Sequence, residues 1–243
     1  MTDASPHDYA WRAHLAGELR RAGRELTQLV LPVSCVGCGG AGASVCAPCA
    51  QALAPRVLRR ALPGGEPVFS GLAFTGIAAR VLRAAKGEAR PSLARGFAPA
   101  LGAALAEASR TAPGRTLRVV TVPTSARSFR ARGFAFVDEA VRACGLRPEP
   151  WLRAVRAADD QRGLAADERA RNVAGTLVCA PPRGVVVRGA SVVVVDDVVT
   201  SGATLVEAVR ALRARGVRVV AAATIAATPR TGERSAGVSA QHP

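Results

Sequence analysis

The pattern of apolar positions divides the chain into strand-like and helix-like stretches, and the clearest of each adjoin near the C-terminus. Four consecutive valines, 192–195, lie in SVVVVDDVVT, which begins at Ser191. An apolar run without polar alternation is typical of a strand buried on both faces, as in a parallel sheet. After a short turn, apolar residues recur at helical spacing from Leu205 to Leu212, and Gly216 ends the pattern. The two patterns predict a strand, a turn and a helix, which is the unit of an α/β fold.

Weaker patterns extend this organisation along the chain. Apolar runs predict further strands at 68–75, 117–122 and 217–223, and Ala- and Leu-rich stretches predict helices at 77–85, 92–109 and about 134–144. The sequence therefore predicts four parts: an amphipathic helix at 1–31, a cysteine-rich knuckle and linker at 32–66, an α/β domain at 67–227 and a disordered tail at 228–243.

Two acids and a turn of small residues follow the four valines directly. Asp196 and Asp197 fall at the expected carboxyl end of the strand, where open α/β sheets bind ligands. The turn Thr200–Thr204, with the sequence TSGAT, leads into the predicted helix, and Gly202 allows the backbone to turn tightly. A helix N-terminus with free N–H groups and small hydroxyl residues binds anions, whereas paired carboxylates suit ribose hydroxyls or Mg²⁺. The spacing therefore predicts a phosphate site beside an acidic one.

Four cysteines form two C-x-x-C pairs before the α/β domain: Cys35, Cys38, Cys46 and Cys49. Four thiolates complete a closed tetrahedral site, so the pairs predict a structural zinc ion. The seven-residue spacer is shorter than is common in such sites. Two disulfides and a redox pair are the alternatives. A reducing compartment argues against the first, and the tandem arrangement argues against the second.

A second strand also ends in small polar residues. The run 117–122 is followed by Pro123, Thr124 and Ser125, and then by three arginines before Gly133: Arg127, Arg130 and Arg132. A strand that leads into a small-residue turn, arginines and a helix is a second layout for binding an anion. Further on, Trp151–Val173 has few apolar residues and weak periodicity, and it is predicted to be a mobile lid.

Composition restricts the classes of function. The length of 243 residues suits one α/β domain with a small appendage, and all three histidines (His7, His14 and His242) lie near the termini, which argues against a histidine-based catalytic dyad. The formal charge of +15 could indicate a nucleic-acid partner, but the arginines are spread along the chain and Lys86 is the only lysine. Solvated faces and phosphate contacts are the favoured interpretation. No secretory signal or membrane span is evident, so a cytoplasmic location is expected.

The order of these pieces resembles the ComF family, phosphoribosyltransferase-like proteins linked to competence and DNA uptake. The cysteine knuckle precedes a Lys-Gly element, then V-P-x-x-x-x-x-x-R-x-R-G-F from Val122, Q-x-x-L-x-x-x-x-R-x-x-N from Gln161, and the acid-rich stretch from Ser191. That stretch is similar to the phosphoribosyl-diphosphate (PRPP) loop of type I phosphoribosyltransferases. The resemblance implies their parallel-sheet core with an N-terminal Cys₄ zinc appendage.

The resemblance also implies roles for individual residues. Catalytic roles fall on Asp196, Asp197, Arg132 and Arg169, and PRPP-binding roles fall on Thr200, Ser201, Gly202, Ala203, Thr204, Pro123, Thr124, Ser125, Lys86, Gln161 and Asn172. Ala135-Phe136 and Gly87 replace, respectively, the Asn-Gln pair and the aromatic residue that are usual in the family, so the acceptor stays open.

The function implied is Mg²⁺-dependent transfer of a phosphoribosyl group from PRPP to a base or an amine. The alternative is a non-catalytic accessory protein that binds PRPP, nucleotides or single-stranded DNA during DNA uptake, with single-stranded DNA or DNA-uptake proteins as partners. Binding of single strands usually uses exposed aromatic rings beside basic residues. Phe129, Phe134, Phe136 and Trp151 lie near arginines in the sequence, and this small number favours the transferase.

Overall fold

A computed structural model of the chain describes residues 33–87, 90–155 and 173–229. The chain divides into two compact units between Cys49 and Ala50. The first unit carries the cysteine knuckle and the start of α2 (Ala47–Gln51), and the second carries all the other helices and strands described below.

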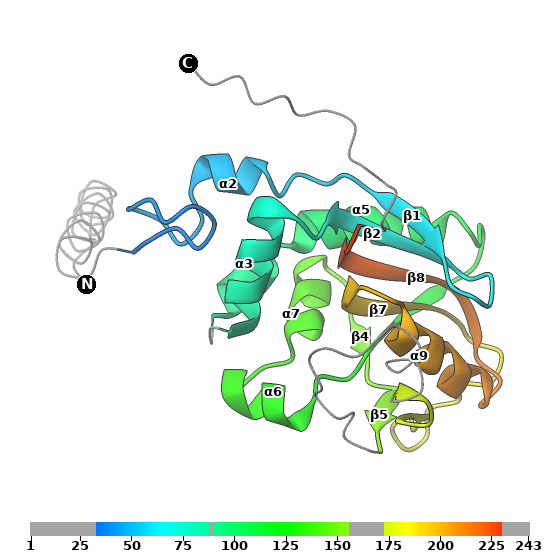
Figure 1. The fold of residues 1–243 in the computed structure, drawn as a ribbon. Helices are drawn as coiled ribbons and strands as arrows, with labels where there is room; N and C mark the ends of the chain where they lie inside the picture. Colours follow the sequence, from blue (N-terminus) through cyan, green and yellow to red (C-terminus); the bar gives the residue numbers. More distant parts are fainter. Residues whose placement is uncertain (1–32, 88–89, 156–172, 230–243) are drawn as a thin grey trace, which may run out of the picture. The chain divides into compact units, whose positions relative to one another are not determined.

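A six-stranded sheet forms the centre of the second unit (Figure 1). Its order is β1-β2-β8-β7-β3-β4, and every neighbouring pair is parallel except β1 and β2. The strands are β1 (Leu58–Ala61), β2 (Pro67–Ala73), β3 (Leu117–Thr121), β4 (Pro148–Glu149), β7 (Ser191–Val199) and β8 (Arg218–Ala227). The prediction of an α/β fold with a mainly parallel sheet is confirmed.

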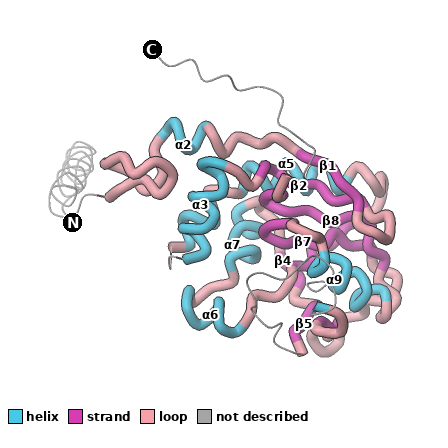
Figure 2. The backbone as a smooth tube through the Cα atoms, viewed as in Figure 1, coloured by secondary structure: helices cyan, strands magenta, loops and turns pink. Residues whose placement is uncertain are grey.

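Helices cover both faces of this sheet (Figure 2). One face carries α9 (Ala203–Arg213), and the other carries α5 (Ala98–Ser109) and α7 (Phe136–Ala143). The remaining helices are α3 (Gly76–Gly87), α4 (Pro91–Arg95) and α6 (Ala126–Arg132). A separate antiparallel pair, β5 (Leu152–Ala154) and β6 (Leu177–Cys179), packs against α9.

The four valines explain why β7 is a central strand. Val192 and Val194 belong to the core that contains Leu205 and Leu212 of α9, whereas Val193 and Val195 are also buried. Since successive strand residues point to opposite faces, both faces of β7 are covered. The second core, under α5 and α7, contains Phe97 and Phe136, whose rings meet edge to face at 6.2 Å.

The chain reverses its direction across the sheet between β3 and β7, which are adjacent. From β3 the chain proceeds outward to β4, while from β7 it proceeds through α9 to β8 on the other side. Ligands of open α/β sheets bind in the crevice at the carboxyl ends of strands at such a switch point. The two polar strand ends that the sequence singles out therefore lie at the position where a ligand site is expected.

One predicted helix is wrong in detail. The single helix predicted over 92–109 is two helices, α4 and α5, which are separated at Gly96 and Phe97. Pro99 lacks the N–H group that a continuous helix would direct to the carbonyl of Arg95, so it lies in the first turn of a new helix instead. The helix predicted at about 134–144 is confirmed as α7, and the arginines before it lie on a further helix, α6, which was not predicted.

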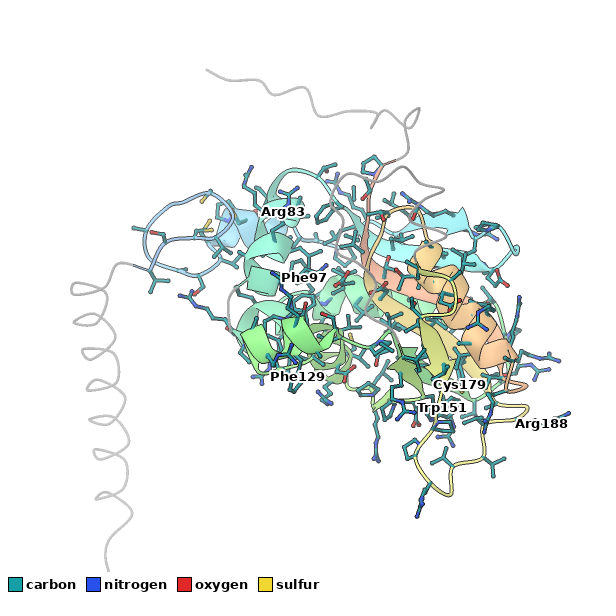
Figure 3. The ribbon with its side chains drawn as sticks, turned by 60° about the horizontal axis from the view of Figure 1, so that its bottom comes forward. Arg83, Phe97, Phe129, Trp151, Cys179 and Arg188 are labelled. Atoms are coloured by element: carbon teal, nitrogen blue, oxygen red, sulfur yellow. The ribbon has the colours of Figure 1, made fainter. Side chains whose placement is uncertain are left out.

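Two other segments also differ from the sequence predictions. The predicted linker over 51–66 contains the edge strand β1, which pairs with β2 in register from Leu58 to Ala61. Trp151, predicted to begin a mobile lid, has no exposed surface and lies in the core beside β5, near Cys179 (Figure 3). Burial of the large apolar ring of Trp151 stabilises the fold, which explains why this residue lies in the core rather than on a mobile lid.

Some predictions fall on residues that the structure does not describe. These are the helix at 8–31, the polar residues Gln161, Arg169 and Asn172, and the tail beyond residue 229. In the described ranges, no helix has both the length and the apolar character that crossing a membrane requires.

Candidate active site

Register between β3 and β7 brings the two polar strand ends together. Thr121 pairs with Val195, and the Val122 N–H donates to the carbonyl of Val195 at 2.8 Å. Pro123 therefore leaves the sheet beside Asp196. A pocket of about 200 Å³, called here the carboxylate pocket, lies at this point and is lined by Lys86, Val122, Pro123, Thr124, Ser125, Ser128, Arg132, Phe136, Val137, Asp196 and Asp197.

An ion pair connects α3 to the end of β7. Lys86, in the last turn of α3, places Nζ 2.7 Å from Oδ2 of Asp197. The side chain of Lys86 is 35% exposed and that of Asp197 is 23% exposed, so both charges stay within reach of a ligand. The structure thus brings the lone lysine to the acid pair from more than 100 positions away in the sequence.

Arg132 adds a second positive charge to the pocket. One of its terminal nitrogens donates to the backbone carbonyl of Lys86 at 3.0 Å. Its Nε is buried and has no hydrogen-bond acceptor among the described residues. A buried donor without an acceptor is unfavourable by about 1–3 kcal/mol, so an anionic oxygen in the pocket would relieve a real deficit.

The carboxyl group of Asp196 is held in an unfavourable environment for a charge. Burial, and then the neighbouring charge of Asp197, raise its pKa to about 7. The Asp197 N–H, which donates to Oδ1 of Asp196 at 2.8 Å, and the charge of Lys86 both act in the opposite direction. Desolvation is the largest effect, which is usual for a carboxyl at a recessed strand end.

The TSGAT turn forms the start of α9, as the sequence predicts. Gly202 is the N-cap residue with φ 86°, a left-handed conformation that favours glycine, and its carbonyl accepts from the Val206 N–H at 2.9 Å. Thr200 and Ser201 are exposed. Gly202 has no side chain that could cap the helix. The Ala203 N–H donates to Oγ of Ser201 at 3.4 Å, and the next N–H groups of the first turn have no intrahelical acceptors. The turn adjoins β7 but is not part of the lining of the carboxylate pocket.

The pocket also contains residues that the sequence analysis missed. Ser128 lines the pocket from α6, and its N–H donates to Oγ of Ser125, the N-cap of that helix, at 3.1 Å. Phe136 and Val137, from the start of α7, contribute an apolar wall. Serine is a common helix N-cap residue, so Ser125 could have indicated the start of α6.

The first unit contains a candidate metal centre. The Sγ atoms of Cys35, Cys38, Cys46 and Cys49 all lie within 4.8 Å of one another, and those of Cys38 and Cys46 are 3.6 Å apart. Tetrahedral Zn–S bonds of about 2.3 Å place pairs of sulfurs about 3.8 Å apart, so this donor set fits zinc. The backbone N–H groups of Gly37 and Cys46 lie 3.4 and 3.3 Å from the Cys35 sulfur, which they stabilise as a thiolate.

The surroundings shift the pKa values of two of these thiols in opposite directions. Hydrogen bonding from the Cys46 N–H lowers the pKa of Cys35 to about 6, whereas burial raises the pKa of Cys49 to about 12. Cys144 and Cys179 lie outside this cluster, and burial raises the pKa of both thiols. Cys179 is buried, while Cys144 is partly exposed and donates to the carbonyl of Ala98.

A family model identifies the fold that carries the site. The model of the phosphoribosyl transferase domain matches residues 97–239, which is more than half of the chain. The chain belongs to this family. The match includes the strand ends of β3 and β7 and the start of α9, and it confirms the prediction of a phosphoribosyltransferase, a pentosyltransferase, at the level of the family.

Solved phosphoribosyltransferase structures are similar over most of the chain. An adenine phosphoribosyltransferase is 16% identical, covers 74% of this chain and 89% of its own, and has a TM-score of 0.38. The adenine enzyme from Saccharomyces cerevisiae is also 16% identical, with coverage of 75% and 89% and a TM-score of 0.36. A hypoxanthine phosphoribosyltransferase from Staphylococcus aureus is 15% identical, with coverage of 63% and 71% and a TM-score of 0.33. Comparison with curated proteins gives no match.

Proposed function

We propose that the carboxylate pocket and the adjoining start of α9 bind PRPP with Mg²⁺, and that this phosphoribosyltransferase transfers the phosphoribosyl group to a nitrogen nucleophile. One observation carries the proposal. Two carboxylates and two basic side chains, from β7, α3 and α6, converge at the switch point beside an uncapped helix start. This combination suits a ligand that carries hydroxyls and several phosphates at once.

The sugar and its 5′-phosphate would occupy the end of β7. Asp196 and Asp197 are partly exposed acceptors that can take hydrogen bonds from the ribose hydroxyls. The 5′-phosphate would lie against the TSGAT turn, where the N–H groups and hydroxyls of Thr200 to Thr204 are available at the positive end of α9. A side chain at residue 202 would require both a left-handed conformation and the displacement of Leu62, whose Cδ2 would lie 3.0 Å from the new Cβ.

The pyrophosphate would lie on the opposite side of the pocket. Lys86 and Arg132 provide the positive charge there, and the Pro123–Ser125 turn provides backbone and hydroxyl donors. Arg132 has the buried Nε without an acceptor, which a phosphate oxygen would satisfy. Lys86 would exchange its contact with Asp197 for one with the pyrophosphate, or would bridge the two.

The donor set of the pocket is compatible with Mg²⁺. This cation prefers oxygen ligands, keeps several waters and commonly binds through substrate phosphates. Most of its ligands would be oxygens of PRPP, and the charges of Asp196 and Asp197 would favour a cation nearby. When bound, Mg²⁺ supplies neutralisation of the pyrophosphate charge.

Catalysis would depend on position and charge rather than on a side-chain nucleophile. The bond from C1′ to pyrophosphate breaks as the acceptor nitrogen approaches, and negative charge grows on the leaving group. Lys86 and Arg132 are placed to stabilise that charge, while the carboxylates fix the ribose. Such preorganised charges typically contribute several kcal/mol to the stabilisation of a transition state.

We further propose that the protein is of the ComF type, with Zn²⁺ as a structural ion and a reducing, cytoplasmic location. The four-thiolate cluster before the phosphoribosyltransferase domain supports this proposal, since its geometry leaves no open coordination position. Gln161, Arg169 and Asn172 keep their proposed roles toward PRPP on the resemblance alone.

The accessory DNA-binding alternative has less support. Of the four aromatic residues that lie near arginines in the sequence, Trp151 and Phe136 are buried, Phe134 is partly buried and Phe129 is 49% exposed. Binding of single strands normally uses successive exposed rings. We therefore keep the transferase as the proposed function.

Calorimetry with Mg·PRPP tests the binding half of the proposal. Gly202→Val should abolish binding because the strained left-handed conformation and the contact with Leu62 would distort the turn. Asp197→Asn should weaken binding about tenfold or more, since a hydrogen bond to a charged group is worth about 1.5–3 kcal/mol. Asp138→Asn is a matched control, because the Asp138 side chain is 26% exposed against 23% for Asp197 and does not line the pocket. Unchanged affinity in a normally folded Asp197→Asn variant would count against the ribose role.

Release of pyrophosphate tests the catalytic half. Wild-type protein should release pyrophosphate from Mg·PRPP with a suitable base or amine, and Gly202→Val should not. If PRPP binds but survives beside a broad panel of acceptors, the protein is a binder and the transferase proposal fails.

A further inference from the structure

A second hollow adjoins the carboxylate pocket on the other side of the Pro123-Thr124 turn. It has a volume of about 410 Å³ and lies between α6 and β5. Pro123 and Thr124 line both hollows, so molecules bound in the two hollows would contact the same turn. This second hollow is called the acceptor groove below.

The walls of the acceptor groove differ from those of the carboxylate pocket. Among the described residues no acidic side chain lines it, whereas Phe129, Leu152 and Ala154 give it an apolar surface. Phe129 lies on α6 with 49% of its surface exposed, which makes it an open ring next to the groove (Figure 3). A large exposed ring that lines a hollow is a surface on which a flat molecule can stack.

Two guanidinium groups complete the lining. Arg130 is in the last turn of α6 and Arg153 is in β5, so they approach the groove from different elements. Both are exposed, and neither pairs with an acid among the described residues, although other arginines of the same unit do, such as Arg95 with Glu139. Unpaired guanidiniums at an apolar hollow favour a ligand that carries a carboxylate or a phosphate.

We propose that the acceptor groove binds the nitrogen nucleophile, and that this acceptor is a planar heteroaromatic ring with an anionic substituent. The proposal rests on the proposed function, because it assigns the substrate class of the same reaction. The ring would stack on Phe129, and its anionic group would contact Arg130 and Arg153. The polar carboxylate pocket would then hold PRPP, and Pro123 and Thr124, which line both hollows, would contact both substrates.

The reaction is balanced without a further reactant. A ring nitrogen forms a bond to C1′ as the bond between C1′ and the pyrophosphate oxygen breaks. Pyrophosphate leaves with the electron pair of that bond, and a proton on the attacking nitrogen, where the ring carries one, passes to water. The anionic substituent takes no part in bond formation, so its role is recognition.

Three pairs of probes separate ring from charge: pyridine-3-carboxylate, pyrimidine-4-carboxylate and imidazole-4-carboxylate, each compared with its own carboxamide. Binding to full-length protein is measured by calorimetry or by ligand-observed NMR. At least one carboxylate should bind about tenfold more tightly than its amide. Phe129→Ala should weaken that carboxylate about tenfold, and Phe129→Tyr, which keeps the ring, should restore its affinity.

The arginine variants test the charge. Arg130→Gln combined with Arg153→Gln should abolish the preference, so that the carboxylate and its carboxamide bind with about equal affinity. Arg183→Gln is the matched control, because it removes one exposed arginine that does not line the groove, and the preference should stay unchanged. If a carboxylate probe binds, and neither Phe129→Ala nor the double arginine variant changes its affinity, the proposal is overturned.

Two further outcomes would also overturn it, and both differ from a failure of the proposed function. If Mg·PRPP binds but no carboxylate of the three pairs does, the acceptor class is wrong while the proposed function stands. If ten-residue oligo(dT) binds, and Phe129→Ala and the double arginine variant abolish that binding, the groove is a nucleic-acid site. Absence of Mg·PRPP binding contradicts the proposed function instead.

Discussion

Asp196 is the described side chain whose environment most clearly combines burial with a like charge. Its pKa is raised to about 7 from an ordinary value of 3.8. In the unfolded chain the carboxyl ionises near pH 4, whereas in the folded protein it keeps its proton up to about pH 7. Its contribution to stability is therefore fully present below pH 4 and is lost as the pH rises through 7.

We expect Asp196→Asn to flatten this part of the pH profile. The amide is neutral at every pH and can still accept the hydrogen bond from the Asp197 N–H. At pH 8 the variant should be more stable than wild type by about 1–3 kcal/mol, and at pH 4 the two stabilities should be equal. This range lies below the free energy that corresponds to the full pKa shift, because the side chain is partly exposed. Urea denaturation between pH 4 and 8 measures the difference.

Asp138→Asn provides the comparison at another partly exposed acid, which pairs with Arg142 at 3.8 Å. Asp138→Asn should not reproduce the gain in stability at pH 8 that is expected of Asp196→Asn, because it removes a carboxylate that has a basic partner. Parallel profiles for wild type and Asp196→Asn would show that the carboxyl of Asp196 titrates normally, and the pKa argument would then fail.

At the scale of elements, α5 lies unusually close to β2. A Cβ atom at Gly71, in the middle of β2, would lie 2.1 Å from the backbone carbonyl oxygen of Ala100 in α5. Backbone atoms in a packed helix cannot move as a flexible side chain can. Glycine at residue 71 therefore sets the distance at which the helix packs on the sheet.

Gly71→Ala should consequently destabilise the protein by about 3 kcal/mol or more, through overpacking between two rigid elements. Gly102→Ala in the same helix is the control, since its Cβ would meet only the Cys144 sulfur at 3.9 Å. That change should stabilise by roughly 0.5–1 kcal/mol, because glycine is unfavourable inside a helix. Equal denaturation midpoints for the two variants would contradict the close approach.

At the scale of the whole molecule, the two units have separate sources of stability. The second unit has cores on both faces of its sheet, and the first has two fully buried cysteines and the four-thiolate cluster. With so little apolar mass, this segment would depend on the proposed zinc ion for folding. Loss of zinc should therefore affect residues 33–49 and leave the sheet intact.

Elemental analysis should find about one zinc per chain, and Cys35→Ser should lower this value while Cys144→Ser should not. In a Trp11→Phe background, the fluorescence of the buried Trp151 reports on the second unit alone. Its thermal transition should be the same in wild type and Cys35→Ser. Protein purified without chelators that lacks metal and has paired cysteines would refute the zinc site.

Much of the fold and of the site could be predicted because the signals are local. The valines 192–195, the acids after them and the TSGAT turn lie within fourteen consecutive residues, and β7, the acid pair and α9 follow from that order. The C-x-x-C pairs are equally local, since each knuckle supplies two sulfurs from one turn. Local signals of this kind persist whatever the rest of the chain does.

The errors occur where short signals compete. The alanines and leucines over 92–109 have strong helical propensity. Pro99, however, lies in the first turn of α5 and divides this stretch into α4 and α5. The arginines of α6 have no apolar periodicity, because no residue of that helix is buried. Periodicity reports burial, so an exposed helix of seven residues leaves little trace of it in the sequence.

The sequence by itself determined the strand β7, the acid pair at its end, the TSGAT turn and the two cysteine pairs, because each depends on residues within one turn or one strand of one another. Only the tertiary structure decided that Lys86 pairs with Asp197, that Arg132 reaches the same pocket, and that a second groove lies beyond Pro123 and Thr124. Those contacts arise from the parallel register of β3 with β7 and from helices that cross the strand ends. Such long-range juxtapositions depend on the packing of the whole sheet, which no local pattern encodes.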